Sequence, residues 1–135
     1  MASQIPKHAK KAVTDGWAAE TLYVCLLTNA FPNTLGAYGV YGDLTNELPT
    51  AGGYTVGGKE VTGRTSSYST NDAVLDATAD VQWTSATFAN VRYAVVYNKT
   101  APFQIRAIYD LGADKTVTGG TFTIQWSASG LIKIS

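Results

Sequence analysis

Three apolar runs lie between residues 91 and 126: Val91-Arg92-Tyr93-Ala94-Val95-Val96-Tyr97, Phe103-Gln104-Ile105-Arg106-Ala107-Ile108-Tyr109 and Thr121-Phe122-Thr123-Ile124-Gln125-Trp126. In each run apolar side chains recur at every second position, which is the period of a β-strand with one buried face. The last run shows this most clearly, because Phe122, Ile124 and Trp126 alternate with polar residues. Polar breaks with turn-forming residues separate the runs. The pattern predicts an antiparallel meander of three strands in the C-terminal third.

Shorter segments before and after this region predict the rest of a β-fold. Residues 21–28 are apolar on both sides, as in a central strand whose two faces are both covered. Further short strands are predicted at residues 59–61, 64–69, 73–77, 81–83 and 131–134. Together these eight or nine strands predict an all-β fold, an antiparallel two-sheet sandwich of jelly-roll type.

The N-terminal segment predicts a short helix over residues 3–15, with Pro6 in its first turn and Gly16 as its stop. Ile5, Ala9, Ala12 and Val13 share one face, and most of the basic side chains (Lys7, His8, Lys10 and Lys11) lie on the other. Two interpretations follow: a helix that lies on the sandwich or frays into solvent, or a basic arm that reaches a neighbouring subunit. We therefore divide the chain into an N-terminal helix or arm, residues 1–16, and a single β-sandwich domain, residues 17–135.

The bulk composition narrows the class of protein. At 135 residues the chain has the length of one domain, and its formal net charge is zero. A neutral chain lacks the basic stripe of a nucleic-acid-binding protein, so no nucleic acid is expected as a partner. The longest apolar runs fall short of 18 residues, so no membrane span is expected. The single cysteine, Cys25, has apolar neighbours and is interpreted as an inert core residue.

Catalytic constellations are not apparent. His8 is the only histidine, so neither a Ser–His–Asp triad nor a multi-histidine metal site can be assembled. The nearest carboxylate pairs, Asp76 with Asp80 and Asp110 with Asp114, stand beside predicted turns, where aspartate usually bonds to its own backbone. The sequence therefore predicts a protein that is not an enzyme and that has no catalytic residue, cofactor or metal ion.

The long segment of residues 29–63 is rich in glycine and tyrosine, a composition found on protein-contact surfaces and also in turns and sheet packing. Exposed tryptophan and tyrosine would also stack on sugars, which keeps a lectin-like interpretation open. The candidate protein-contact residues are Lys7, Lys10, Lys11, Trp17, Phe31, Tyr38, Tyr41 and Tyr54.

An ordered set of motifs adds a family resemblance over residues 21–135. The motifs are Leu22-Tyr23-Val24-Cys25-Leu26-Leu27-Thr28, Leu44-Thr45-Asn46-Glu47-Leu48, Gly52-Gly53-Tyr54-Thr55-Val56-Gly57-Gly58, Asp80-Val81-Gln82-Trp83, Arg92-Tyr93-Ala94-Val95-Val96-Tyr97, Tyr109-Asp110-Leu111-Gly112 and Gly120-Thr121-Phe122-Thr123-Ile124-Gln125-Trp126. In this order they resemble a family of small virion structural proteins of tailed bacteriophages.

The resemblance implies a structural component of the phage virion, made in the cytoplasm of the bacterial host. Our first expectation is a capsid decoration (cement) protein that binds the major capsid protein on the outside of the head and stabilises the shell. The alternatives are a tail or neck protein and a carbohydrate- or receptor-binding sandwich module. Since modules of this kind usually assemble with closed symmetry, we also expect self-association as a dimer or trimer.

Overall fold

The computed structural model of the protein describes residues 4–34, 38–127 and 129–134. One α-helix, a single turn of 3-10 helix (η1) and seven strands are found in these residues. Their bounds are α1 (Lys7–Ala18), β1 (Leu22–Thr28), η1 (Tyr41–Asp43), β2 (Lys59–Glu60), β3 (Arg64–Ser69), β4 (Asp72–Ala77), β5 (Val81–Asn98), β6 (Ile105–Ile124) and β7 (Ile132–Ile134).

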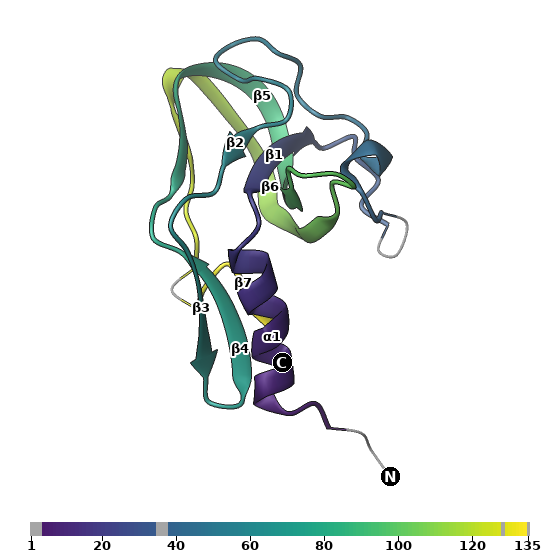
Figure 1. Ribbon diagram of the computed structural model, residues 1–135. Helices are drawn as coiled ribbons and strands as arrows, with labels where there is room; N and C mark the ends of the chain where they lie inside the picture. The colour runs from purple at the N-terminus through teal and green to yellow at the C-terminus, as the bar shows by residue number, and fades with distance from the viewer. Residues whose placement is uncertain (1–3, 35–37, 128, 135) are drawn as a thin grey trace.

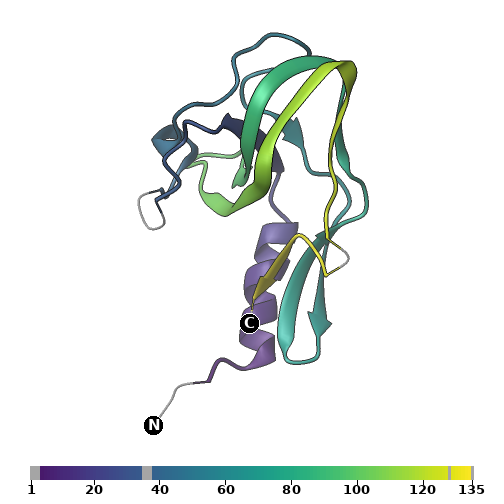
Figure 2. The same cartoon turned by 180° about the vertical axis from the view of Figure 1, so that it is seen from behind.

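The strands form two antiparallel sheets (Figure 1). A four-stranded sheet has the order β2-β1-β5-β6, and a three-stranded sheet has the order β3-β4-β7. Helix α1 lies along the three-stranded sheet, and the view from behind shows β7 in yellow beside the same helix (Figure 2). The predicted all-β fold, with two antiparallel sheets and a short N-terminal helix, is confirmed, with seven strands in the described residues in place of eight or nine.

The predicted three-strand meander is wrong in detail, because its runs belong to one long hairpin. Strand β5 continues from Val81 to Asn98, and β6 joins the second and third apolar runs. Only the break between β5 and β6 is a true turn, in which the Asn98 amide donates to the Gln104 carbonyl at 2.8 Å. Elsewhere β5 bends through register shifts next to Ser85 and Asn90, whose φ values are 49° and 61°. Bulges of this kind bend a strand without ending it.

The four-stranded sheet has apolar cores on both faces. Leu22, Val24 and Leu26 of β1 belong to the larger core, whereas Cys25 and Leu27 face the smaller one. This confirms the prediction of a central strand covered on both sides. Cys25 is fully buried, and that burial raises the pKa of its thiol well above the ordinary value, as expected for an inert core residue. The alternating C-terminal face is confirmed as well, since Phe122, Ile124 and Trp126 all pack in or against the larger core.

Helix α1 differs from the prediction at both ends. Pro6 is its N-cap residue and lies outside the first turn, and the helix continues through Gly16 to Ala18. Gly16 does not end the helix because its φ lies outside the left-handed region that a glycine stop adopts, and Trp17 and Ala18 beyond it are held by packing against the core. Trp17 is therefore a helical residue.

Replacing Gly16 by alanine is expected to stabilise the protein by roughly 0.5–1 kcal/mol, because alanine loses less backbone entropy in a helix. A Cβ atom at this position would meet no atom within 4 Å, so no steric cost offsets the gain. Urea unfolding followed by circular dichroism measures the change. A destabilised Gly16→Ala variant would show that the helix does not run through this residue.

Candidate functional site

The apolar side of α1 faces solvent. Ile5 is 59% exposed and Val13 is 41% exposed, and Ala9, Ala12 and Gly16 are exposed as well. Ile5 precedes the helix, whereas Ala9, Ala12, Val13 and Gly16 lie within it and, at about 100° per residue, form one stripe, which we call the outward face. Thr14, on the opposite side of the helix, is fully buried. The sequence pattern suggests the reverse orientation, with the apolar side packed and the basic side in water.

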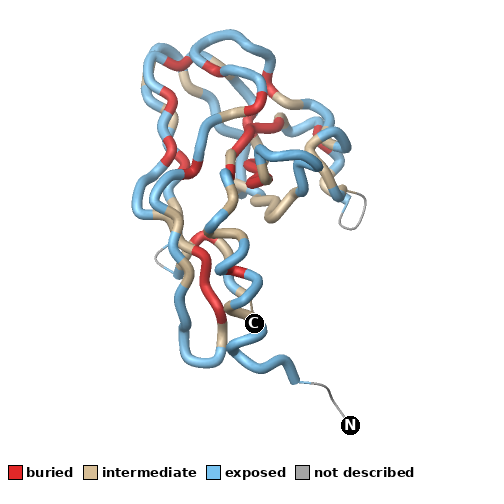
Figure 3. Tube along the Cα trace, viewed as in Figure 1, coloured by how far each residue is buried: buried red, intermediate tan, exposed pale blue. Residues whose placement is uncertain are grey.

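Polar side chains fasten the inward side of α1 to the three-stranded sheet. Thr14 Oγ1 shares a 2.6 Å hydrogen bond with Ser66 Oγ of β3, and Lys10 Nζ donates to the Asn71 carbonyl at 3.0 Å. Lys10 also lies 3.8 Å from Asp72 at the start of β4. Figure 3 shows the buried run of β4 alongside the helix. The helix therefore packs Thr14 and the stem of Lys10 against the sheet, and Ala9, Ala12 and Val13 remain outside.

Tyr68 of β3 occupies the centre of a second group of contacts with the helix. Lys7 Nζ lies 5.0 Å and Lys11 Nζ 5.6 Å from the centroid of its ring, and its hydroxyl shares a 2.6 Å hydrogen bond with His8 Nδ1. Lys11 also bonds to Asp15 at 2.8 Å. The three lysines predicted as part of a basic arm thus contact their own sheet or helix, while Lys7 itself remains exposed.

The C-terminal end of α1 is tied to the four-stranded sheet through Arg106. Its Nε and Nη2 atoms donate to the two carboxylate oxygens of Glu20 at 2.9 and 2.5 Å. The same guanidinium lies 5.1 Å from the Trp17 ring centroid, and Asn98 adds a 3.0 Å bond to Glu20. Trp17, predicted as a contact residue, is half-buried beneath this ion pair and packs on the core. Both ends of the helix are therefore held in place.

Replacing Arg106 by lysine should destabilise the protein by about 1–2 kcal/mol, since an ammonium group can neither bridge both Glu20 oxygens nor stack on Trp17 in the same way. The matched control is Arg92→Lys. Arg92 forms a similar forked pair with Asp110, but it is 32% exposed, against 14% for Arg106. We expect at most about 1 kcal/mol at this more exposed site. Equal losses in urea unfolding would show that the Arg106 contacts do not hold the helix.

The aromatic contact candidates of the long segment are largely interior. Phe31 and Tyr54 are 2% and 1% exposed, and Tyr38 packs on Phe31 with ring centroids 4.8 Å apart. Tyr41 stacks on Tyr97 of β5 at 4.6 Å. With the exception of Tyr54, which belongs to the larger core, these rings cover the outer face of the four-stranded sheet. Their high frequency in the segment is explained by packing.

Glu47 fastens this segment to the sheet. Its carboxylate accepts hydrogen bonds from the Tyr41 hydroxyl, from the Tyr54 hydroxyl at 2.5 Å and from the Gly57 amide at 2.7 Å. The Tyr54 hydroxyl in turn accepts from the Leu26 amide of β1 at 3.1 Å. Every bond links a loop residue to the carboxylate or to the sheet, so the group acts as a structural clamp.

Alkaline unfolding should follow from the buried phenols. Burial, with the hydrogen bond to Glu47 as a second cause, raises the pKa of Tyr41 and of Tyr54 above 10, and burial alone raises that of Tyr109. The unfolded chain ionises its phenols near pH 10, so this contribution to stability is complete below that pH and is lost as the pH rises further. We expect tyrosinate absorbance from these residues to appear together with loss of near-ultraviolet circular dichroism. Full phenol titration with the fold intact would contradict the burial.

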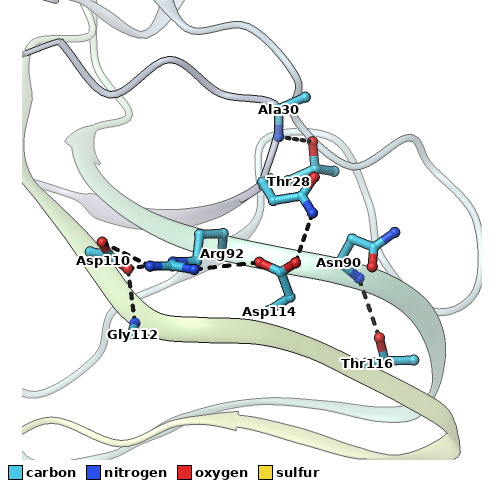
Figure 4. A network of polar contacts seen from close by, with 9 residues as sticks. Thr28, Ala30, Asn90, Arg92, Asp110, Gly112, Asp114 and Thr116 are labelled. Atoms are coloured by element: carbon cyan, nitrogen blue, oxygen red, sulfur yellow. Dashed lines mark hydrogen bonds and ion pairs between the residues drawn. The ribbon is translucent and has the colours of Figure 1, made fainter.

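Three of the four carboxylates considered as catalytic groups, Asp76, Asp110 and Asp114, make structural contacts. Asp110 and Asp114 both face Arg92, at 2.6 and 3.7 Å, and Asn29 donates to Asp114 at 2.8 Å (Figure 4). The hydrogen bond from Arg92, together with the Gly112 amide, holds the pKa of Asp110 below its ordinary value. Asp76 accepts from the adjacent Ala77 amide, but it lies within β4 and Asp110 and Asp114 lie within β6, so the predicted turns beside them are wrong. Through Arg92, Asp110 and Asp114 hold β5 and β6 together.

A small hollow lies beside the aromatic pair Tyr109 and Trp126, whose ring centroids are 6.0 Å apart. Its volume is about 200 Å³, and Leu111, Ile124 and Leu131 line its base. Asp110, Gln125 and Ser127 also contribute to its lining, and the Asp110 carboxylate itself is held by Arg92 and the Gly112 amide. The sequence pattern places Trp126 in the core and does not predict the hollow. The hollow forms where residues 109–111 in the first half of β6 come close to residues 125–131, which follow the same strand.

Comparison with protein-family models, with curated proteins and with solved structures gave no match to this chain. Within the described residues, no helix has both the length and the apolar character needed to cross a bilayer. The same residues contain no group of three or more His, Cys, Asp or Glu side chains arranged to hold a metal ion.

Proposed function

We propose that the protein is a structural component of a tailed-phage virion, and that it binds the outer surface of the head as a decoration (cement) protein. The observation that carries the proposal on the structural side is the outward face of α1. An apolar helix face that is held in solvent by polar contacts on its other side is a preformed protein-contact surface. The motif order described above supports the phage particle as its setting.

The distribution of exposed apolar side chains supports the same surface. In the described residues the exposed large apolar side chains are Ile5, Val13, Val56, Tyr68 and Phe103. Val13 lies on the outward face, Ile5 lies just before the helix, and Tyr68 lies next to the helix. A capsid presents many equivalent sites, so a small contact surface of this kind gains its effect through repetition. The major capsid protein is the proposed partner, and a tail or neck protein is the alternative partner within the same particle.

Imaging labelled virions by electron microscopy tests the proposal. A decoration protein predicts label at regular positions over the head surface. Label on the neck or tail would move the protein to the alternative location, and particles without label would reject a virion role. The protein is proposed to be made in the host cytoplasm and to reach its final location on the particle.

A saccharide-binding module is the second candidate, favoured by the hollow beside Trp126. Aromatic rings that line a small hollow suit a sugar, because the apolar face of a sugar ring stacks on them. Glycan-array binding that is lost in Trp126→Ala would support this candidate. Trp17 and Tyr41 are less suitable targets, since the first packs under Arg106 and the second stacks on Tyr97. Absence of glycan binding by the wild-type chain would reject it.

A further inference from the structure

We propose that the turn between β5 and β6, residues 99–104, is a second protein-contact surface, and that it binds a protein subunit that offers an apolar pocket beside a carboxylate. Phe103 fills the pocket, and Lys99 pairs with the carboxylate. The identity of this subunit rests on the proposed function: on a phage head it is a copy of the major capsid protein.

Phe103 has a backbone conformation that the turn requires and that its own side chain disfavours. Its φ is 59°, in the left-handed region that large side chains adopt only with strain. Hydrogen bonds fix this conformation from both sides. The Phe103 amide donates to the Thr100 carbonyl at 2.9 Å, and the Phe103 carbonyl accepts from the Tyr41 amide at 2.8 Å. Since these are backbone groups, glycine would make the same bonds without strain, and the turn itself does not explain an aromatic residue.

Packing inside the protein does not explain the Phe103 side chain either. Phe103 is 41% exposed and belongs to neither of the two apolar cores in the described residues. Its neighbours Ala101 and Pro102 are exposed as well. A large aromatic side chain that is held outward at a strained position gains stabilisation when a partner buries it. Aromatic residues of this kind contribute much of the binding energy of protein interfaces.

Lys99 supplies the charge of this surface. The side chain is exposed, and its Nζ atom lies 5.0 Å from the ring centroid of Tyr23 and 5.9 Å from that of Tyr97. In the part of the chain that the structure describes, Lys99 forms no salt bridge, whereas Arg106 at the start of β6 is paired with Glu20. A carboxylate on the partner would therefore complete the surroundings of the Lys99 ammonium group.

One exposed aromatic ring and one unpaired cation fit a protein partner better than a membrane or a nucleic acid. Electrostatic attachment to an anionic membrane takes a cluster of about four to eight basic residues, and nucleic acid takes a basic stripe that a chain of zero net charge lacks. Helix α1 lies in the lower half of Figure 1 and the end of the β5–β6 hairpin in the upper half. The turn and the outward face can therefore contact different subunits of a shell and bridge them.

Replacing Phe103 by glycine separates binding from folding. The variant should unfold at a urea concentration no lower than that of the wild type, because glycine relieves the strain and no core packing is lost. The matched control is Thr70→Gly, since Thr70 in the turn between β3 and β4 also has a left-handed φ, of 57°. A lower urea midpoint for Phe103→Gly than for both the wild type and the control would show that the ring stabilises the fold itself, and would overturn the proposal.

Co-sedimentation with capsids assembled from the major capsid protein alone tests the contact. Phe103→Gly and Lys99→Glu should each weaken binding at least about tenfold. Thr70→Gly should bind like the wild type, and so should Lys115→Glu, which makes the same charge change at another exposed lysine within β6. Equal binding by all four variants would overturn the contact surface at the turn.

Two further outcomes identify a different error. A wild-type chain that does not bind these capsids would reject the proposed capsid role, and the named partner with it, whatever the variants do. Binding of the wild type to vesicles of anionic phospholipid, lost in Phe103→Gly, would assign the turn to a membrane and overturn the protein partner.

Discussion

Replacing Gly58 by alanine is expected to lower the free energy of unfolding by about 4 kcal/mol, enough to unfold a marginal domain. Gly58 has a φ of 83°, in the left-handed region that alanine adopts only with strain. An added Cβ atom would also lie 1.8 Å from the Val24 carbonyl oxygen and 2.8 Å from Cys25 Cα. Since both of these are backbone atoms of β1, the central strand itself would have to move.

The control for this prediction is Gly42→Ala. Gly42 lies in η1, its φ is outside the left-handed region, and an added Cβ would meet nothing within 4 Å. The control should change stability by less than about 1 kcal/mol in the same urea titration. If Gly58→Ala unfolds at the same urea concentration as Gly42→Ala, the close approach of the loop to β1 is incorrect.

Replacing Trp83 by alanine should cost about 3–5 kcal/mol, the range observed for large aromatic side chains removed from a core. Trp83 is 1% exposed and contacts Tyr54 and Phe122, with ring centroids 6.0 and 6.1 Å away. It joins the long loop, β5 and β6, so its removal would leave a cavity at the centre of the larger core. Urea unfolding measures the loss.

Two other substitutions define what Trp83 contributes. Trp83→Phe should lose much less than Trp83→Ala, because the indole Nε1 has no hydrogen-bond partner in the described part of the chain and phenylalanine removes that buried polar atom. Trp126→Ala, at a half-buried site, should also cost less than Trp83→Ala. A loss for Trp83→Ala no greater than that for Trp126→Ala would be inconsistent with the proposed core.

Several elements could be predicted from the sequence because their residues carry the signal locally. Strand β1 is apolar on both sides and is covered on both sides. The alternation of Phe122, Ile124 and Trp126 likewise identifies the face that packs. In contrast, the breaks near Ser85 and Asn90 resemble strand ends, and only the partner strand shows that the backbone bulges there and continues.

The orientation of α1 could not be predicted from its own pattern. Apolar periodicity identifies the stripe of Ile5, Ala9, Ala12 and Val13 but not what lies beside the opposite side. That side is held by Ser66, Tyr68 and Asp72, which are 52 to 62 residues away from their partners in the sequence and have no recognisable spacing to the helix. Phe31 and Tyr54 were predicted as contact residues but are buried, for a related reason. Glycine- and tyrosine-rich segments occur both on protein surfaces and in packed loops, so their composition does not distinguish the two.

The most direct test of the whole account is the reactivity of cysteines placed on the two sides of α1. Ala12→Cys and Thr14→Cys are compared under native conditions, in which buried Cys25 does not react. We predict that Ala12→Cys reacts with a thiol reagent at least about tenfold faster than Thr14→Cys, because position 12 faces solvent and position 14 is fully buried. Faster reaction at position 14 would mean that the apolar side of the helix is packed against the sheet, and the outward face would not exist.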